Sequence, residues 1–341
     1  MPLIELDRRG FLSWMGTAAA GSLSLSPRTE PWADAVAVPV LQHALRHLRY
    51  LPETHDSGVL DEVTERALIR FKRHARRPYR VVAATGQPDD VPPHACFSGA
   101  CDPEIGEETV RELMHWLGRG WTLPLGRFRL VSLAGDDPRA PASLRYTLLR
   151  EDVASAWRVV MGEVTARGGT VAGPYGDTWR PLGYHRKDGA SRRSFHITGR
   201  AIDLNQRLAN GPGQRYFLVP EIVRDRQFFR IYCRTLRQDG SQGSLFEAGR
   251  YGCWQFFSTT PTPIPRGYYL DLTALLAAHR FDRVPAQEGW ESNYLRTEWW
   301  HYHYSAHKQE TFLDECELVG VSEGDLLRAG YTVEEIDRRP G

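Results

Sequence analysis

The sequence predicts an α+β protein, in which a small three-helix N-terminal module is followed by an α+β domain with an antiparallel sheet. Within residues 36–117, apolar side chains recur every three or four positions in three separate stretches, the spacing of amphipathic helices. After residue 150, strand and helix segments are mixed without the regular alternation that builds a parallel sheet. The 341 residues, 41% hydrophobic and 25% charged, are enough for two domains.

Each of the three expected helices of the module has its own apolar face. Leu41, Leu45 and Leu48 form the first face, and residues 64–71 form the second after the turn at "HDSG". The third face lies in residues 110–117, behind "GEET", where a glycine followed by acidic residues suits the start of a helix.

Composition and periodicity also predict the structure of the segments after residue 117. Residues 118–150 are rich in Gly, Pro and Arg and are expected to be a connector with one short strand at "RFRLVSL". Residues 151–310 are expected to form the α+β domain. One helix is expected where apolar residues from Val153 to Val164 line one face, and another at "LTALLAAHR", capped by Asp271. Residues 311–341 are left as a C-terminal extension.

The first 35 residues resemble a twin-arginine export signal. Arg8 and Arg9 precede Phe11 and Leu12, an uncharged run extends to Ser26, and "ADA" at 33–35 offers a cleavage site between small residues. The alternative is a frayed N-terminal helix. The resemblance implies a protein that is exported and is periplasmic, extracellular or associated with the cell wall.

Charge and hydropathy exclude two classes of partner. Lys and Arg total 43 against 42 Asp and Glu, so no overall charge favours nucleic acid or an anionic membrane. No apolar stretch reaches the roughly 20 residues of a membrane span, so none is expected in the mature chain.

Five cysteines allow one or two disulfides in an exported protein. Cys96 lies near Cys101, Cys233 and Cys253 flank a loop-like stretch, and Cys316 is left over. A zinc–cysteine site is the competing interpretation, but the chain has no pair of C-x-x-C motifs.

Two stretches carry residues suited to metal chemistry. "SFHITGRAID" places His196 and Asp203 seven positions apart, and "TEWWHYHY" places Glu298 three positions before His301, with His303 two further on. A catalytic zinc ion needs three protein ligands, an open position for water and a nearby carboxylate that takes a proton from that water. The two stretches together supply that set of groups.

The two stretches resemble the zinc D-alanyl-D-alanine peptidase family (peptidase family M15), which includes carboxypeptidases, dipeptidases and phage endolysins. They fill every specified position of its S-x-H-x-x-G-x-A-x-D and E-x-W-H motifs, in the family's order, and the resemblance spans roughly residues 150–307. It implies a zinc peptidase domain in which His196, Asp203 and His301 hold Zn2+ and Glu298 is the general base and later the acid. The family's spacing between the glutamate and the histidine also selects His301 over His303. His303 is then expected to be a residue that supports the site or belongs to the core.

Regular strand alternation would point His301 and His303 to one face and Glu298 to the other, so a bend is required between Glu298 and His301.

Negative charge that develops on an attacked carbonyl calls for a cation beside the metal. Members of the family carry an arginine upstream of the first zinc ligand, which favours Arg186, ten residues before His196, narrowly over Arg180 in "TWRP". The alternative for each is a solvated arginine on a loop.

Residues 36–117 resemble the peptidoglycan-binding module found beside many cell-wall hydrolases, on the phrases "VLQHALRHLRYL", "DEVTERALIRFK" and "GEETVREL". The chain departs from that module by an insertion at residues 76–103, and a helical spacer that binds nothing is the alternative. The resemblance implies peptidoglycan as the partner.

The sequence therefore predicts a zinc-dependent peptidase that hydrolyses peptide bonds in peptidoglycan stem peptides, of the D,D-carboxypeptidase or endopeptidase type, in cell-wall remodelling. One alternative is a non-catalytic peptidoglycan-binding or scaffold protein that retains a structural zinc site. Another is a cell-wall amidase or hydrolase of a different zinc class. Four aromatic residues near the second motif either line a substrate groove or belong to the core: Trp290, Tyr294, Trp299 and Trp300.

Overall fold

The computed structural model is an α+β protein that divides into two compact units, Met1–Pro124 and Leu125–Gly341. It describes residues 32–340 except 77–78, 82–87, 91–95, 136–138, 146, 172, 174, 184–191, 211–212, 250 and 255–260. Residues 1–31 of the predicted export signal lie outside this description. Among the described residues, no helix combines the length and apolar character needed to cross a membrane.

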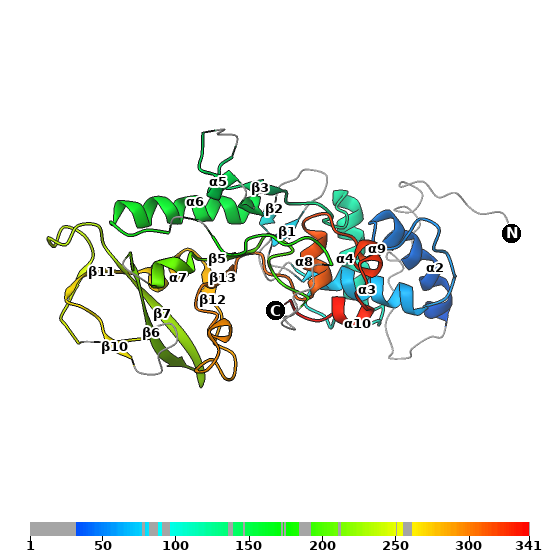
Figure 1. Ribbon diagram of the computed structural model, residues 1–341. Helices are drawn as coiled ribbons and strands as arrows, with labels where there is room; N and C mark the ends of the chain where they lie inside the picture. Colours follow the sequence, from blue (N-terminus) through cyan, green and yellow to red (C-terminus); the bar gives the residue numbers. More distant parts are fainter. Residues whose placement is uncertain are drawn as a thin grey trace. The chain divides into compact units, whose positions relative to one another are not determined.

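The three predicted N-terminal helices are present in the first unit (Figure 1): α2 (Trp32–His47), α3 (Glu62–Ala75) and α4 (Glu107–Arg119). Asp61 caps α3 by accepting a hydrogen bond from the Thr64 amide at 2.9 Å, and Gly120, at φ 69°, ends α4. Phe71 and Trp116 are buried and meet edge to face, with ring centroids 5.4 Å apart. The apolar faces of the helices thus share one core.

The end of the insertion after α3 is hydrogen-bonded to that helix. Two described pieces of it pair as an antiparallel hairpin, β1 (Tyr79–Val81) with β2 (Pro88–Asp90). Further along, the buried Lys72 ammonium donates to the Asp102 carboxylate at 2.8 Å and to the Glu104 carbonyl at 2.6 Å. Lys72 therefore stabilises the loop that leads into α4.

The segment expected as a connector contributes regular structure to the second unit. Strands β3 (Leu130–Ser132) and β4 (Leu148–Arg150) pair antiparallel, with the short helix α5 (Ala142–Arg145) between them. Helix α6 (Glu151–Ala166) follows β4 directly. Its predicted apolar face is buried through Val153, Trp157, Val160 and Val164.

The sheets of the second unit are antiparallel, as predicted. One has the order β6-β7-β11-β8 and another the order β12-β13-β5. Asp271 caps α7, with its carboxylate 2.9 Å from the Ala274 amide. The bounds of these elements are β5 (Ala201–Asp203), β6 (Tyr216–Val223), β7 (Arg226–Arg234), β8 (Ser244–Phe246), β11 (Gly267–Asp271), α7 (Leu272–Ala278), β12 (Phe281–Arg283) and β13 (His301–Tyr304).

The main core of this unit lies between α6, α7 and the sheets. Trp157, Tyr302 and Trp299 are among its fully buried members, and Trp300 is 5% exposed. Trp299 and Trp300 are therefore core residues, which resolves the choice that their sequence left open. Trp290 and Tyr294 are partly buried and pack against the same core.

Short elements complete the second unit. They are the 3-10 turns η2 (Gln206–Ala209) and η3 (Tyr294–Arg296), the strand pair β9 (Gly252–Cys253) with β10 (Thr262–Pro263), and the C-terminal helices α8 (Phe312–Glu317), α9 (Glu323–Arg328) and α10 (Val333–Ile336). The β6–β7 hairpin and the C-terminal helices lie at opposite ends of this unit, with β5 and β13 between them (Figure 1).

Cys233 and Cys253 do not form the disulfide that their sequence allowed. Both are free, buried thiols, and they belong to two different hydrophobic clusters. Burial raises the pKa of each thiol to about 11. Both cysteines therefore act as apolar core side chains.

Candidate metal centre

Two of the three predicted ligands are placed by strand pairing. In the register of β13 with β5, His301 lies opposite Asp203, Tyr302 opposite Ile202 and His303 opposite Ala201. Directly opposed residues in an antiparallel pair point to the same face of the sheet. The sheet therefore brings His301 to Asp203 across 98 positions of sequence.

The third predicted ligand, His196, comes from a turn just before β5. Its amide donates to the Ser194 hydroxyl at 3.3 Å, and its carbonyl accepts the Gly199 amide at 3.2 Å. Gly199 has φ 64°, and a Cβ atom there would lie 2.7 Å from the Arg150 nitrogen. The glycine of the first motif is thus required by backbone conformation and by close packing against β4.

Three side-chain atoms converge at one point. His301 Nδ1 lies 2.9 Å from Asp203 Oδ1, His196 Nε2 lies 3.3 Å from the same oxygen, and the two nitrogens are 3.2 Å apart. Zinc bonds of about 2.0–2.1 Å in a tetrahedral site separate neighbouring ligand atoms by about 3.3 Å. The distances of 3.2 and 3.3 Å match that separation, and the distance of 2.9 Å is somewhat shorter.

The proton arrangement at this point also favours a cation. To hydrogen-bond Asp203 Oδ1, each of the two imidazole nitrogens must carry a proton. Two N–H groups would then face each other at the 3.2 Å contact between His196 and His301. A shared cation removes that conflict, because all three atoms then present lone pairs to it.

Burial and charge set the protonation states that metal binding requires. Burial lowers the pKa of His196, more strongly than the neighbouring Asp203 carboxylate raises it, so the imidazole is neutral near pH 7. Burial raises the pKa of Asp203, but electrostatic attraction to the His196 ring and hydrogen bonds from His196 and His301 hold it well below its usual value. A neutral imidazole and an ionised carboxylate are the metal-binding forms.

The second carboxylate oxygen of Asp203 is held separately. Asp203 Oδ2 accepts the Asp177 amide at 3.3 Å, and the Asp203 amide donates to the Asp177 carbonyl at 2.8 Å. Gly176 packs against Asp203, since a Cβ atom on Gly176 would lie 2.8 Å from the Asp203 Cβ. One oxygen is thus fixed by the backbone while the other faces the two histidines.

Glu298 lies at the bend that the strand alternation required. Its φ is 50°, in the left-handed region, and its carbonyl accepts the His301 amide at 3.0 Å, closing a turn before β13. The side chain is half-buried and accepts a hydrogen bond from Gln287 at 2.9 Å. Glu298 is not one of the three converging groups. A left-handed conformation in a residue other than glycine is strained, and such strain is frequent at functional sites.

His303 does not join the three converging residues. Its ring stacks on Phe195, with centroids 5.1 Å apart, and burial lowers its pKa to about 3. This neutral, partly buried imidazole packs as an aromatic side chain against the residue that precedes His196.

Of the two arginine candidates, Arg186 lies outside the described residues. Arg180 is buried, and its amide donates to the His196 carbonyl at 3.1 Å. Its guanidinium donates to the Asp177 carboxylate at 2.5 and 3.0 Å. Arg180 is thus a cation beside the histidine turn, oriented by Asp177.

Sequence reasoning missed Asp177 and Gln287. Asp177 supports Asp203 and Arg180, and Gln287 orients the Glu298 carboxylate. Neither residue lies in a recognised motif. Their contacts depend on chain segments that meet only in the folded protein, so no local pattern marks them.

Comparisons of the chain with protein-family models, with curated proteins and with solved structures found no match.

Proposed function

We propose that the protein is a zinc-dependent peptidase, in which His196, Asp203 and His301 bind the ion. The main support is that two imidazole nitrogens and one carboxylate oxygen lie 2.9, 3.2 and 3.3 Å from one another. Three nitrogen and oxygen ligands with a fourth position left for water are typical of catalytic zinc sites. The match to both motifs of the D-alanyl-D-alanine peptidase family supports the same assignment.

Zinc and individual residues of the chain have separate roles in the proposed reaction. Zinc, when bound, lowers the pKa of a coordinated water and polarises a substrate carbonyl. Glu298 accepts the proton of the attacking water and later donates it to the leaving amine. Its bend and the hydrogen bond from Gln287 hold that carboxylate in place. Arg180 or Arg186 stabilises the negative charge that develops on the attacked carbonyl oxygen.

We propose peptidoglycan stem peptides as the substrate, with cell-wall remodelling as the role. The support is the resemblance of the N-terminal helices to a peptidoglycan-binding module and of residues 1–35 to an export signal. Both features suit an exported, periplasmic or wall-associated protein. The bond that is cut is of the D,D-carboxypeptidase or endopeptidase type.

Digestion of purified peptidoglycan tests the proposal. The mature chain is incubated with sacculi, with and without a chelator, and the soluble products are identified by mass spectrometry. Free D-alanine or cleaved peptide cross-links, lost with the chelator and restored by zinc, are expected. Separated glycan and intact peptide would instead indicate an amidase, and a lack of products in zinc-loaded protein would favour a binding protein.

Glu298→Gln is the matched control for that digestion. It removes the proposed base, keeps the size of the side chain and leaves the three converging residues intact. Products that persist at the wild-type rate with Glu298→Gln would contradict the proposed role of Glu298.

A further inference from the structure

The three converging residues differ in how they are supported. Asp203 and His301 lie on paired strands, so backbone hydrogen bonds fix their register. His196 lies in a turn, in the segment 192–200, which has no partner strand. Its position must therefore depend on what packs against that segment. Besides β4, Arg180 and His303, this segment packs against the C-terminal segment, defined here as residues 311–340.

Apolar packing joins the two segments next to His196. Ile197 is 4% exposed and belongs to a small hydrophobic cluster. The other buried members of the cluster in the described chain all come from the C-terminal segment: Phe312, Leu313, Cys316, Leu326, Tyr331 and Ile336. The residue after His196 is thus part of the core of the three C-terminal helices.

Buried charges also join the two segments, at Arg200, four residues after His196. Arg200, fully buried, donates to the Glu315 carboxylate, to the carbonyl of Tyr304, the last residue of β13, and to the carbonyl of Ala306 just after it. The other oxygen of Glu315, also fully buried, lies 3.3 Å from Arg150 Nη1. The Arg150 amide in turn donates to the Gly199 carbonyl at 2.9 Å. Glu315 of α8 therefore binds two arginines that both hold the histidine turn.

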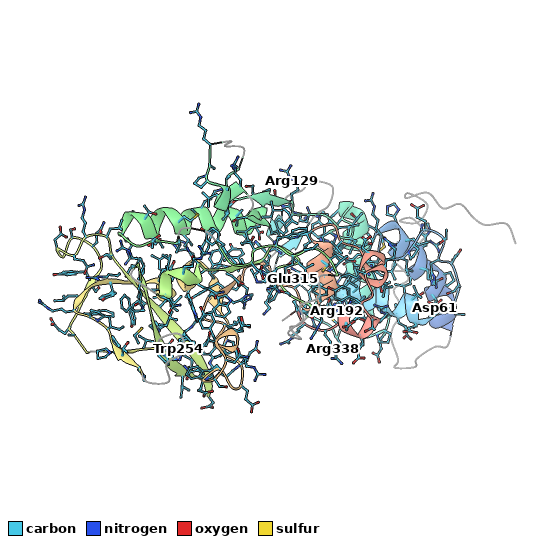
Figure 2. The ribbon with its side chains drawn as sticks, viewed as in Figure 1. Asp61, Arg129, Arg192, Trp254, Glu315 and Arg338 are labelled. Atoms are coloured by element: carbon cyan, nitrogen blue, oxygen red, sulfur yellow. The ribbon has the colours of Figure 1, made fainter. Side chains whose placement is uncertain are left out.

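Further contacts hold the start of the segment. The Tyr331 hydroxyl donates to the Arg192 carbonyl at 2.9 Å, and the Arg192 guanidinium lies over the Tyr331 ring at 4.4 Å. Arg193 donates to the Arg339 carbonyl at 2.6 Å. Figure 2 marks Arg192 and Glu315 in this C-terminal part of the unit, well away from Trp254 in the sheet region.

We propose that the C-terminal segment is a positioning element for the metal centre. It fixes the turn that carries His196 against β5 and so sets the affinity for zinc, although it supplies none of the three converging atoms. This inference rests on the proposed zinc site. Ile197 and Glu315 act through His196 and are positioning residues.

The test compares two deletions of buried side-chain volume. Ile197→Ala loosens the packing beside His196, whereas Ile231→Ala, in β7, removes the same atoms from a fully buried position in the main core. Zinc affinity is measured by competition with a chromophoric chelator, and the unfolding midpoint of the metal-free protein is recorded for both. The visible absorption of bound Co2+ reports ligand geometry independently of activity.

Ile197→Ala is expected to weaken zinc binding by about 10–100-fold, the range found when residues that support a ligand are lost, and to alter the Co2+ spectrum. Ile231→Ala is expected to bind zinc within about twofold of wild type. If Ile197→Ala does not fold, Tyr331→Phe, which removes only the hydroxyl that holds Arg192, is expected to weaken binding by a few-fold.

Equal zinc affinity and an unchanged Co2+ spectrum in the folded variant beside His196 would overturn the positioning role alone. An equal loss of affinity in Ile231→Ala would overturn it too, because general stability would then explain the effect. A wild-type chain that binds no zinc would contradict the proposed function itself, and with it this inference.

Discussion

His301 lies directly opposite Asp203 in the antiparallel pairing of β13 with β5, with Nδ1 of the histidine 2.9 Å from Oδ1 of the aspartate. This relationship joins the two sequence motifs into one site. A shift of one residue in the register would turn His301 to the other face of the sheet. The register of a three-residue strand pair thus decides whether the site exists.

Separate roles are predicted for Glu298 and His196. Glu298→Gln is expected to retain zinc and to lower kcat by about a hundredfold or more, because proton transfer loses its carboxylate. His196→Ala is expected to lose the metal, because one ligand atom is gone. Elemental analysis of both purified variants, alongside hydrolysis rates, checks this. Equal zinc content in the two variants would be incompatible with the roles assigned.

The two histidines of β13 are expected to differ in their effect on metal binding. His301→Gln removes one of the three converging atoms and is expected to reduce zinc affinity by more than about a hundredfold. His303→Gln disturbs the stacking on Phe195 and is expected to cost stability, with zinc retained. Chelator competition and thermal unfolding of both variants provide the comparison. Loss of zinc only in the His303 variant would reverse the assignment.

Gly199 is predicted to tolerate no side chain. Gly199→Ala places a Cβ atom 2.7 Å from the Arg150 nitrogen in a left-handed conformation, so it is expected to destabilise the second unit by more than about 2 kcal/mol. The control is Gly162→Ala in α6, where no atom lies within 4 Å of the new methyl group, with an expected gain of about 0.5–1 kcal/mol. Denaturant unfolding of the two variants gives both values, and equal effects would disprove the steric argument.

A pH dependence is predicted for the pair of the buried Arg150 with the partly buried Asp152. The guanidinium donates to both carboxylate oxygens at 2.7 and 2.9 Å, and it holds the pKa of Asp152 below its usual value although burial raises it. A depressed pKa in the folded state adds stability above the unfolded pKa of about 3.9, and this is lost as pH falls through the folded value. The destabilisation caused by Asp152→Asn should therefore be largest near neutral pH and shrink below about pH 4. Urea unfolding across this range measures it, and a destabilisation that does not change with pH would refute the prediction.

Local patterns predicted the parts of the fold that depend on local physics. Helical periodicity located α3, α4 and α6, and the conflict between strand alternation and motif spacing required the bend observed at Glu298. The boundaries of the second unit were not predictable in this way. The connector and the C-terminal extension were expected as segments separate from the α+β domain, yet residues 125–150 of the connector and the extension belong to its unit, while residues 118–124 belong to the first unit.

The missed contacts share one physical cause. Arg200 binds Glu315 across 115 positions of sequence. Charged residues are usually exposed, so the sequence alone does not show that these two are buried and paired. The backbone of Asp177 likewise meets Asp203 only in the folded chain, across 26 positions of sequence. The tryptophans beside His301 were ambiguous because an apolar groove and an apolar core use the same residues.

The zinc site is tested most directly by a crystal structure of the zinc-incubated protein, with anomalous diffraction recorded on both sides of the zinc absorption edge. We predict one zinc peak within about 2.0–2.2 Å of His196 Nε2, Asp203 Oδ1 and His301 Nδ1. An absence of zinc at these three atoms, or a zinc ion bound only at other residues, would contradict it.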